Sequence, residues 1–267
     1  MIDALLDRVA RRIAPPIAAV PPEIQNEVDA VWREGLGAID LAEARERFVA
    51  DGELAVFPQL LPAAFAARTL DEIDQARPRR SRVPLIRAAQ HVGWRTLQRI
   101  APRATALYHS PVFLDWMTAL VERPMLLKDS ADDHACATYE YTRVGDHMRP
   151  HYDACGCEDG ASFTQLLSLH DRSSQRLIVD LHTRDDRPVE RRSIQTLPGT
   201  LVVFCGTKVL HSVSRLRAGE RRVTLSMSYA SDPTMKPWKR LYENVKDALL
   251  YFGPSALVRG IRPGPRA

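Results

Sequence analysis

The sequence predicts an α+β fold in which a helical N-terminal region precedes a core of short β-strands and a C-terminal helix. Two observations indicate this division. Residues 1–100 show mainly helical patterns broken by prolines, whereas residues 137–231 consist of short β-type segments separated by turn signals. Several short strands at close spacing are typical of a sandwich or barrel.

The length and composition fit a single domain. A chain of 267 residues with 45% hydrophobic residues is long enough to bury a sizeable core, and no long biased segment indicates disorder. We expect one domain over 1–267. Its parts are a mainly helical region over 1–100, a β core over 101–235, and a C-terminal helix and tail over 236–267.

The N-terminal region opens with an amphipathic pattern over Met1–Ile13, where apolar residues follow helical spacing with charges between them. A secretory signal needs an uninterrupted apolar stretch, so we expect none here. The clearest later helices are Ile39–Ala50 and Pro62–Ala76, with a short strand, Leu54–Leu60, between them.

Seven segments of the core have strand-like composition and flanking turns. They are Ala137–Thr142, His147–Asp153, Phe163–Leu169, Arg176–Leu181, Ser193–Thr196, Thr200–Phe204 and Arg222–Ala230. We expect Trp238–Phe252 to form a helix packed on the outside of this core.

Charge and composition argue against several classes of partner. The formal net charge is +4, and the arginines are scattered rather than interleaved with aromatic residues, which disfavours nucleic-acid binding. No run of 18 apolar residues could span a bilayer. Four cysteines fit a reduced compartment, so we expect a cytoplasmic protein.

Two histidines and one aspartate form the most informative pattern in the chain. His151-Tyr152-Asp153 is followed 60 residues later by His211. If 149–153 is a strand, His151 and Asp153 share one face while Tyr152 points away, and a neighbouring strand can bring His211 alongside. Two histidines and a carboxylate are the ligands of non-haem iron(II) sites with open positions. The simpler interpretation is a set of ordinary polar residues on strands.

Further motifs strengthen the metal-site interpretation. Pro198–Phe204 reads as a turn and a buried strand, followed by His211-Ser212-Val213 and Gly219-Glu220-Arg221. Together with the HxD pair, these motifs resemble the iron(II)- and 2-oxoglutarate-dependent dioxygenases. In that family HxD is followed by GxLxxF, HxV and GxR, with the arginine ten residues after the second histidine. Tyr141–Gly145 resembles the family's Y-x-x-G approach to the HxD strand, with one extra residue.

This resemblance implies a double-stranded β-helix (jelly roll) core and a set of site residues. His151, Asp153 and His211 would hold Fe(II) and form the catalytic centre, with 2-oxoglutarate as cosubstrate and O2 as oxidant. Tyr141 and Arg221 would bind the cosubstrate. Turnover would release succinate and CO2.

Arg221 suits the far carboxylate of 2-oxoglutarate because a guanidinium is a planar, two-pronged donor. The alternative is that Arg221 is a surface residue, since Arg222 stands beside it. Strand alternation should place the two on opposite faces, so we favour Arg221 and keep Arg222 as the second candidate.

The flanking segments resemble one branch of the family more specifically. Leu107–Pro111, Asp132–His134 and Ser231–Gly253 are similar to the BesD-like enzymes, which act on free amino acids as radical halogenases or hydroxylases. The halogenases of that branch have Gly or Ala in place of Asp153, so its retention favours hydroxylation. Ser173–Leu177 stands where prolyl-hydroxylase-type relatives have Gly-Gly-Glu-Thr, so substrate selection cannot be copied from them.

Three residues are candidates for binding the substrate. Arg87 could hold a substrate carboxylate, although a solvated helix arginine is the simpler interpretation. Ser226 and Ser228 share a strand face and could line the pocket, or they could simply pack inside the barrel.

Other potential ligands have weaker patterns. Cys155-Gly156-Cys157 lacks the second pair that a closed zinc site needs, so these cysteines are more simply loop thiols. His134 and His147 are more simply surface or supporting residues than additional ligands.

The sequence thus predicts an oxygenase that hydroxylates an unactivated C–H of a free amino acid or similar small metabolite. Two alternatives stay open. The same chemistry could act on a protein or carrier-bound substrate, or end in desaturation or cyclisation. The chain could also be a non-catalytic β-helix binding module, against which the complete set of His151, Asp153, His211 and Arg221 counts.

Overall fold

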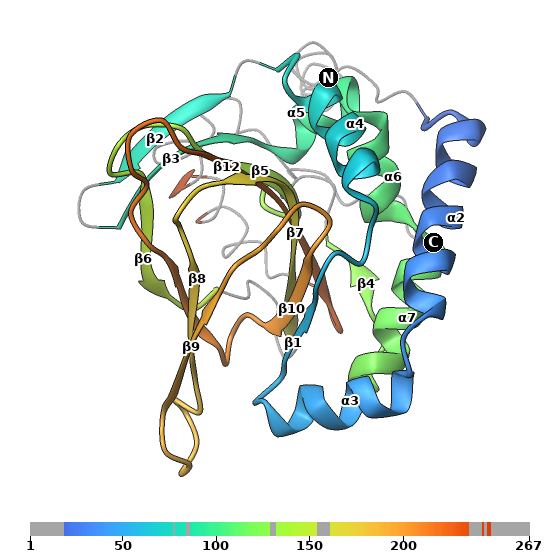
Figure 1. Ribbon diagram of the computed structural model, residues 1–267. Helices are drawn as coiled ribbons and strands as arrows, with labels where there is room; N and C mark the ends of the chain where they lie inside the picture. Colours follow the sequence, from blue (N-terminus) through green and yellow to red (C-terminus); the bar gives the residue numbers. More distant parts are fainter. Residues whose placement is uncertain are drawn as a thin grey trace, which may run out of the picture.

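A curled antiparallel sheet of twelve strands forms the centre of the computed structural model, and helices cover one of its faces (Figure 1). The structure describes residues 19–76, 78–83, 86–128, 132–153 and 161–234, together with 242, 245 and 246. The expected helix at Met1–Ile13 lies outside the described residues, as does nearly all of Trp238–Phe252.

Six described helices precede the main run of strands. They are α2 (Pro22–Gly37), α3 (Leu41–Ala50), α4 (Ala63–Ile73), α5 (Trp94–Ile100), α6 (Pro102–His109) and α7 (Pro111–Val121). Two of these helices, α3 and α7, begin with a side-chain cap. The Asp40 side chain accepts from the backbone of Ala42 and Glu43 at the start of α3, and Ser110 caps α7 ahead of Pro111. No helix among the described residues is long and apolar enough to cross a membrane.

The strands curl so that distant segments become neighbours. They are β1 (Leu54–Phe57), β2 (Arg79–Val83), β3 (Arg87–Val92), β4 (Leu126–Leu127), β5 (Cys136–Tyr141), β6 (His147–His151), β7 (Ser162–Arg172), β8 (Leu177–Leu181), β9 (Glu190–Ile194), β10 (Leu201–Cys205), β11 (Leu210–Val213) and β12 (Arg221–Ala230). The main path runs β1-β10-β7-β12-β5-β3-β6-β11-β8-β9. The predicted α+β class with a jelly-roll core is confirmed.

Two apolar cores lie on the two faces of the sheet. The helices pack against the outer face, where β12 contributes alternate residues such as Val223, Leu225 and Met227. The barrel interior holds the second core, which includes Tyr141 and Phe204. Strands buried on both faces read as continuous apolar runs, as β10 does.

The N-terminal region contributes more strand than its pattern predicts. Residues 1–100 were expected to be mainly helical, yet β2 and β3 form a hairpin there, and β3 inserts between β5 and β6. Conversely, helices α6 and α7 lie beyond residue 100, in the part assigned to the β core. The arginine-rich strand β2 lacks an apolar alternation, so its pairing with β3 decides its conformation.

A buried carboxylate fixes the turn that leads into β6. Asp146 accepts hydrogen bonds from the backbone N–H groups of Thr142 and Arg143, and from Arg80 at 2.5 and 3.3 Å. Burial raises the pKa of Asp146, but these donors outweigh it and hold the pKa below its usual value. The carboxylate is therefore charged and hydrogen bonded immediately before β6.

We expect Asp146→Asn to lower the free energy of unfolding by about 2–3 kcal/mol at pH 7, because charge-assisted hydrogen bonds to a buried group are lost. A depressed pKa in the folded state gives stability that is present above about pH 4 and is lost as the pH falls through the folded-state pKa. Urea unfolding at pH 7 and at acidic pH measures both effects. The exposed Asp186→Asn is the control, and equal stabilities of the two variants at pH 7 would contradict this role.

Candidate metal centre

Three side chains converge at one end of the barrel to form a group that could hold a metal ion. His151 ends β6 and lies directly opposite His211 of β11 in the sheet. The Nε2 atoms of both histidines are 3.6 Å from Asp153 Oδ1, and the possible ligand atoms all lie within 4.8 Å of one another. The structure thus brings together the three residues that the sequence pattern predicts, and no other such group occurs among the described residues.

Backbone carbonyls orient the two imidazoles. His151 Nδ1 lies 2.9 Å from the Arg149 carbonyl oxygen, and His211 Nδ1 lies 3.1 Å from that of Val209. A carbonyl oxygen only accepts, so each Nδ1 carries the proton and each Nε2 presents its lone pair. This hydrogen bond on the far nitrogen is the usual way in which a protein fixes a metal-binding histidine.

Asp153 is held differently from the expected strand geometry. Strand β6 ends at His151, and Asp153 follows it, with its N–H donating to the Gly206 carbonyl at 2.9 Å. Thr164 donates to Asp153 Oδ2 at 2.5 Å, which leaves Oδ1 facing the histidines. Tyr152 points elsewhere and donates to Thr183, as alternation predicts.

The surrounding charges keep the Asp153 carboxyl ionised. Burial raises its pKa, but the interactions with His211, His151 and Lys128 and the hydrogen bond from Thr164 lower it below the usual value. Burial lowers the pKa of His211, although Asp153 opposes this. A neutral imidazole beside an ionised carboxylate is the protonation pattern that a metal ligand set requires.

Gly206 allows Asp153 to approach the sheet closely. A Cβ at position 206 would lie 2.7 Å from both Cβ and Oδ2 of Asp153. Any larger residue would therefore displace the carboxylate.

We expect Gly206→Ala to weaken Fe(II) binding by about 10- to 100-fold, the range seen when residues that orient metal ligands are altered. Anaerobic Fe(II) titration measures this change. Gly37→Ala is the matched control, since nothing lies within 4 Å of a Cβ at position 37. Unchanged iron affinity in Gly206→Ala would show that Asp153 tolerates displacement.

On the interior face of β12 lies a second group of buried polar atoms, which have no hydrogen-bond partners among the described residues. Arg222 is 1% exposed, faces the interior opposite Tyr141, and has no hydrogen-bond partner for Nε or Nη1 among the described residues. The buried Thr224 hydroxyl, two residues further on the same strand face, is also unpartnered. Buried donors without acceptors are strongly unfavourable, so these atoms suit a bound anion such as a carboxylate.

Arg221 occupies the other face of β12. Its guanidinium pairs with Asp74 near the end of α4, at 2.5 and 3.3 Å, and lies 3.9 Å from Glu140. The preference for Arg221 over Arg222 is therefore not supported by the structure, which turns Arg222 into the barrel. The alternation of polar and apolar residues along 222–229 already contained this signal, since Ser226 and Ser228 cannot share a face with Arg221.

All four remaining candidates are buried. Tyr141, Ser226 and Ser228 lie on the interior face, and Arg87 of β3 is 4% exposed. Tyr141 is paired with Arg222 in the sheet, and burial raises the pKa of Tyr141 while the charges of Arg222 and Arg87 lower it. Arg87 is thus a strand residue and not the expected helix residue.

The other histidines and cysteines of the described ranges do not join the metal group. His134 contacts the Tyr139 hydroxyl at 3.2 Å, and His147 is hydrogen bonded to the Gly145 carbonyl. Cys155-Gly156-Cys157 lies outside the described residues. Thr164, Gly206 and Thr224 were not identified from the sequence, because only the folded sheet brings them to the site.

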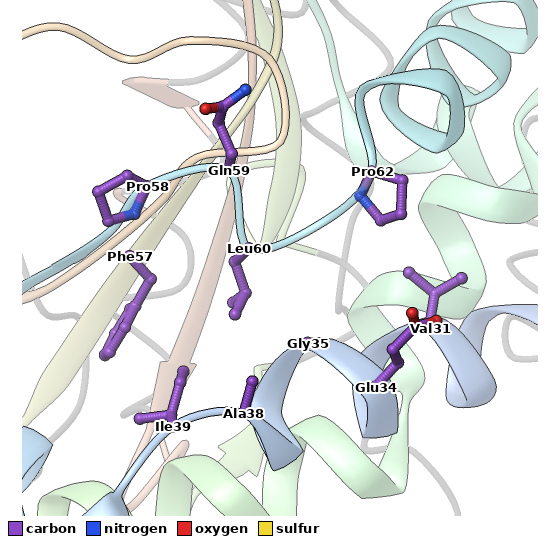
Figure 2. Close-up of a pocket in the computed structure, with 10 residues that line it drawn as sticks. All are labelled: Val31, Glu34, Gly35, Ala38, Ile39, Phe57, Pro58, Gln59, Leu60 and Pro62. Carbon is purple, nitrogen blue, oxygen red and sulfur yellow. The ribbon is translucent and has the colours of Figure 1, made fainter.

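One hollow of about 500 Å³ lies away from this site, between α2 and the segment that follows β1 (Figure 2). Apolar side chains such as Phe57, Leu60 and Ile39 line it, and Glu34 is its one charged residue. It offers neither a metal-ligand set nor a cluster of cations.

Solved structures share this architecture. The non-heme alpha-ketoglutarate-dependent epimerase SnoN from nogalamycin biosynthesis has a TM-score of 0.58 at 18% identity, over 75% of this chain and 86% of that chain. SnoN in complex with Fe3+, alpha-ketoglutarate and nogalamycin RO gives 0.56 at 17% identity, over 85% and 93%. A prolyl hydroxylase from Trichoplax adhaerens, bound to a hypoxia-inducible-factor peptide fragment, gives 0.56 at 14% identity, over 72% and 89%.

The fold is that of these oxygenases. Identities of this size show a common architecture and leave the chemistry of this chain to its own residues. No protein-family model and no curated protein sequence matches the chain.

Proposed function

We propose that this chain is an Fe(II)- and 2-oxoglutarate-dependent oxygenase. One observation carries the proposal: the barrel interior holds both a His-Asp-His group with two available Nε2 atoms and Arg222. The Nε and Nη1 atoms of Arg222 are buried and have no partner within the described ranges. Two imidazoles and one carboxylate suit Fe(II) and leave positions for a chelating cosubstrate. The barrel interior thus offers ligands for iron and a cation for the cosubstrate carboxylate.

The residues that would hold the iron are His151, Asp153 and His211. The carbonyls of Arg149 and Val209 keep each Nδ1 protonated, so both Nε2 atoms stay available as ligands. The Thr164 hydroxyl binds Asp153 Oδ2 and keeps the carboxylate turned towards the histidines.

The residues that would hold 2-oxoglutarate are Arg222, Thr224 and Tyr141. Arg222 offers its Nε and Nη1 donors to the far carboxylate, and the Thr224 hydroxyl can donate to the same group. Tyr141 lies opposite Arg222 on the neighbouring strand β5. The bound iron and cosubstrate together supply the oxidising chemistry, and the protein provides position and shelter from water.

We further propose hydroxylation of a free amino acid or similar small metabolite as the reaction. Retention of Asp153, held by Thr164 and Gly206, supports oxygenation over halogenation. The segments similar to the BesD-like branch support a free amino acid as substrate, and we propose membership of that branch. We also propose one catalytic domain over 1–267, because helices α2–α7 share one apolar core with the sheet. We propose the cytoplasm as its location.

Anaerobic titration of the metal-free protein with Fe(II) and 2-oxoglutarate tests the proposal. We expect the weak visible charge-transfer band of a chelated 2-oxoglutarate complex, and its loss in His211→Ala. On admission of O2 the wild-type complex should release succinate slowly even without substrate. Iron binding without the band would contradict the cosubstrate assignment and would favour a binding module.

A further inference from the structure

Lys128 lies at the metal end of the barrel, directly after β4. Leu127 of β4 pairs with Tyr229 of β12, and both side chains pack into the helix-side core. Side chains alternate along an extended chain, so the next residue, Lys128, is directed to the barrel interior, level with Ser228.

The backbone of Lys128 is fixed by a buried phenol. Its N–H donates to the Tyr108 hydroxyl at 3.0 Å, and that hydroxyl donates to the Ser228 carbonyl at 3.2 Å. The Tyr108 ring stacks on Tyr229 with centroids 5.0 Å apart. The backbone of Lys128 is therefore linked to β12 through the Tyr108 hydroxyl.

This position brings the lysine close to the proposed iron site. Ser228 lies opposite Thr164, whose hydroxyl binds Asp153. The charge of Lys128 also reaches the Asp153 carboxyl, where it acts with the two histidines to lower the pKa against the effect of burial. Within the described part of the chain, no carboxylate forms an ion pair with Lys128, so its ammonium is available to another anion.

That anion is not the far carboxylate of 2-oxoglutarate. Arg222 and Ser228 are separated by six residues of β12, which is about 20 Å at the usual rise of a strand. A small dicarboxylate that reaches from the metal to Arg222 extends away from Lys128. The two cations therefore lie towards opposite ends of β12.

We propose that Lys128 anchors a carboxylate of the substrate, and so places a nearby C–H beside the iron. This inference rests on the proposed function and names one recognition group for its substrate. A lysine ammonium is a compact cation with three donors, and it suits a carboxylate at a partly exposed cavity mouth. The hydroxyls of Ser162 and Ser228, 3.3 Å apart, lie on the same face and can complete the contact.

The test uses the anaerobic Fe(II)/2-oxoglutarate complex and a panel of free L-amino acids with their C-terminal amides as probes. Binding beside the iron shifts the charge-transfer band, which gives a dissociation constant without turnover. For the acid that binds wild-type protein most tightly, we expect Lys128→Met to raise the dissociation constant by about 10- to 100-fold, the effect of losing a hydrogen bond to a charged group. Lys128→Arg should retain part of the affinity, and the amides should bind weakly to all forms.

Arg123→Met is the matched control, because it removes an exposed positive charge from the same connection. It should bind the acid as wild type does, and the affinity of Lys128→Met for 2-oxoglutarate should be unchanged. Equal binding of acid and amide, no acid that shifts the band, or wild-type affinity in Lys128→Met would each overturn the anchor. Absence of the band before any probe is added would instead refute the proposed function.

Discussion

Replacement of Asp153 by glycine is expected to abolish substrate oxidation and to weaken Fe(II) binding by more than about 100-fold. Loss of a direct ligand should exceed the 10- to 100-fold effects of altering the residues that orient ligands. Asp153 is the only carboxylate in the group, and its Oδ1 lies 3.6 Å from both histidine Nε2 atoms. Fe(II) titration and O2-dependent succinate release measure the two effects.

Tyr152→Phe is the control for this substitution. It alters the neighbouring side chain, whose hydroxyl donates to Thr183 and not to the metal group. We expect its iron affinity to stay close to that of wild type. Full succinate release in Asp153→Gly would remove Asp153 from the iron site.

Replacement of Arg222 by methionine is expected to raise the dissociation constant for 2-oxoglutarate by about 100-fold, because a charge-assisted contact with a carboxylate is lost. The variant should still fold. Methionine fills the same space without an unpaired charge in the barrel, so the ligand-free protein should be at least as stable as wild type. The rise in Tm on addition of 2-oxoglutarate should disappear.

Arg221→Met is the paired comparison. Its ion pair with Asp74 is partly exposed, so the free energy of unfolding should change by about 1 kcal/mol or less, and 2-oxoglutarate affinity should be retained. The opposite outcome, with affinity lost in Arg221→Met and kept in Arg222→Met, would return the cosubstrate contact to Arg221.

The metal group was predictable from the sequence because its pattern is largely local. His151 and Asp153 are two residues apart, and the motifs around His211 have characteristic spacing. His151 and Asp153 lie together, as a strand over both residues would predict. The strand ends at His151, however, and Asp153 is held by a hydrogen bond to Gly206.

The supporting residues were not predictable, because they depend on contacts between distant segments. Thr164 reaches Asp153 only when β7 curls beside the end of β6, and nothing in its local sequence indicates this. Arg222 differs from these, because the alternation of polar and apolar residues along β12 was visible in the sequence. The ten-residue spacing to Arg221 outweighed that alternation in the sequence-based choice.

Strands β2 and β3 show where composition misleads. Both lie in a region with helical patterns, and β2 carries three arginines in five residues. Pairing with β5 and β6 decides the conformation of β3, and such pairing is invisible to local propensity.

The insertion of β3 between β5 and β6 also limits how this protein can be divided. The helical N-terminal part is not a detachable module, because the same stretch supplies a central strand of the barrel sheet. A fragment starting after residue 100 would expose the hydrogen-bonding edges of β5 and β6, which are the kind of open edges that promote association between chains. Evolution of this chain by exchange of its N-terminal third would therefore require a replacement that also closes the barrel.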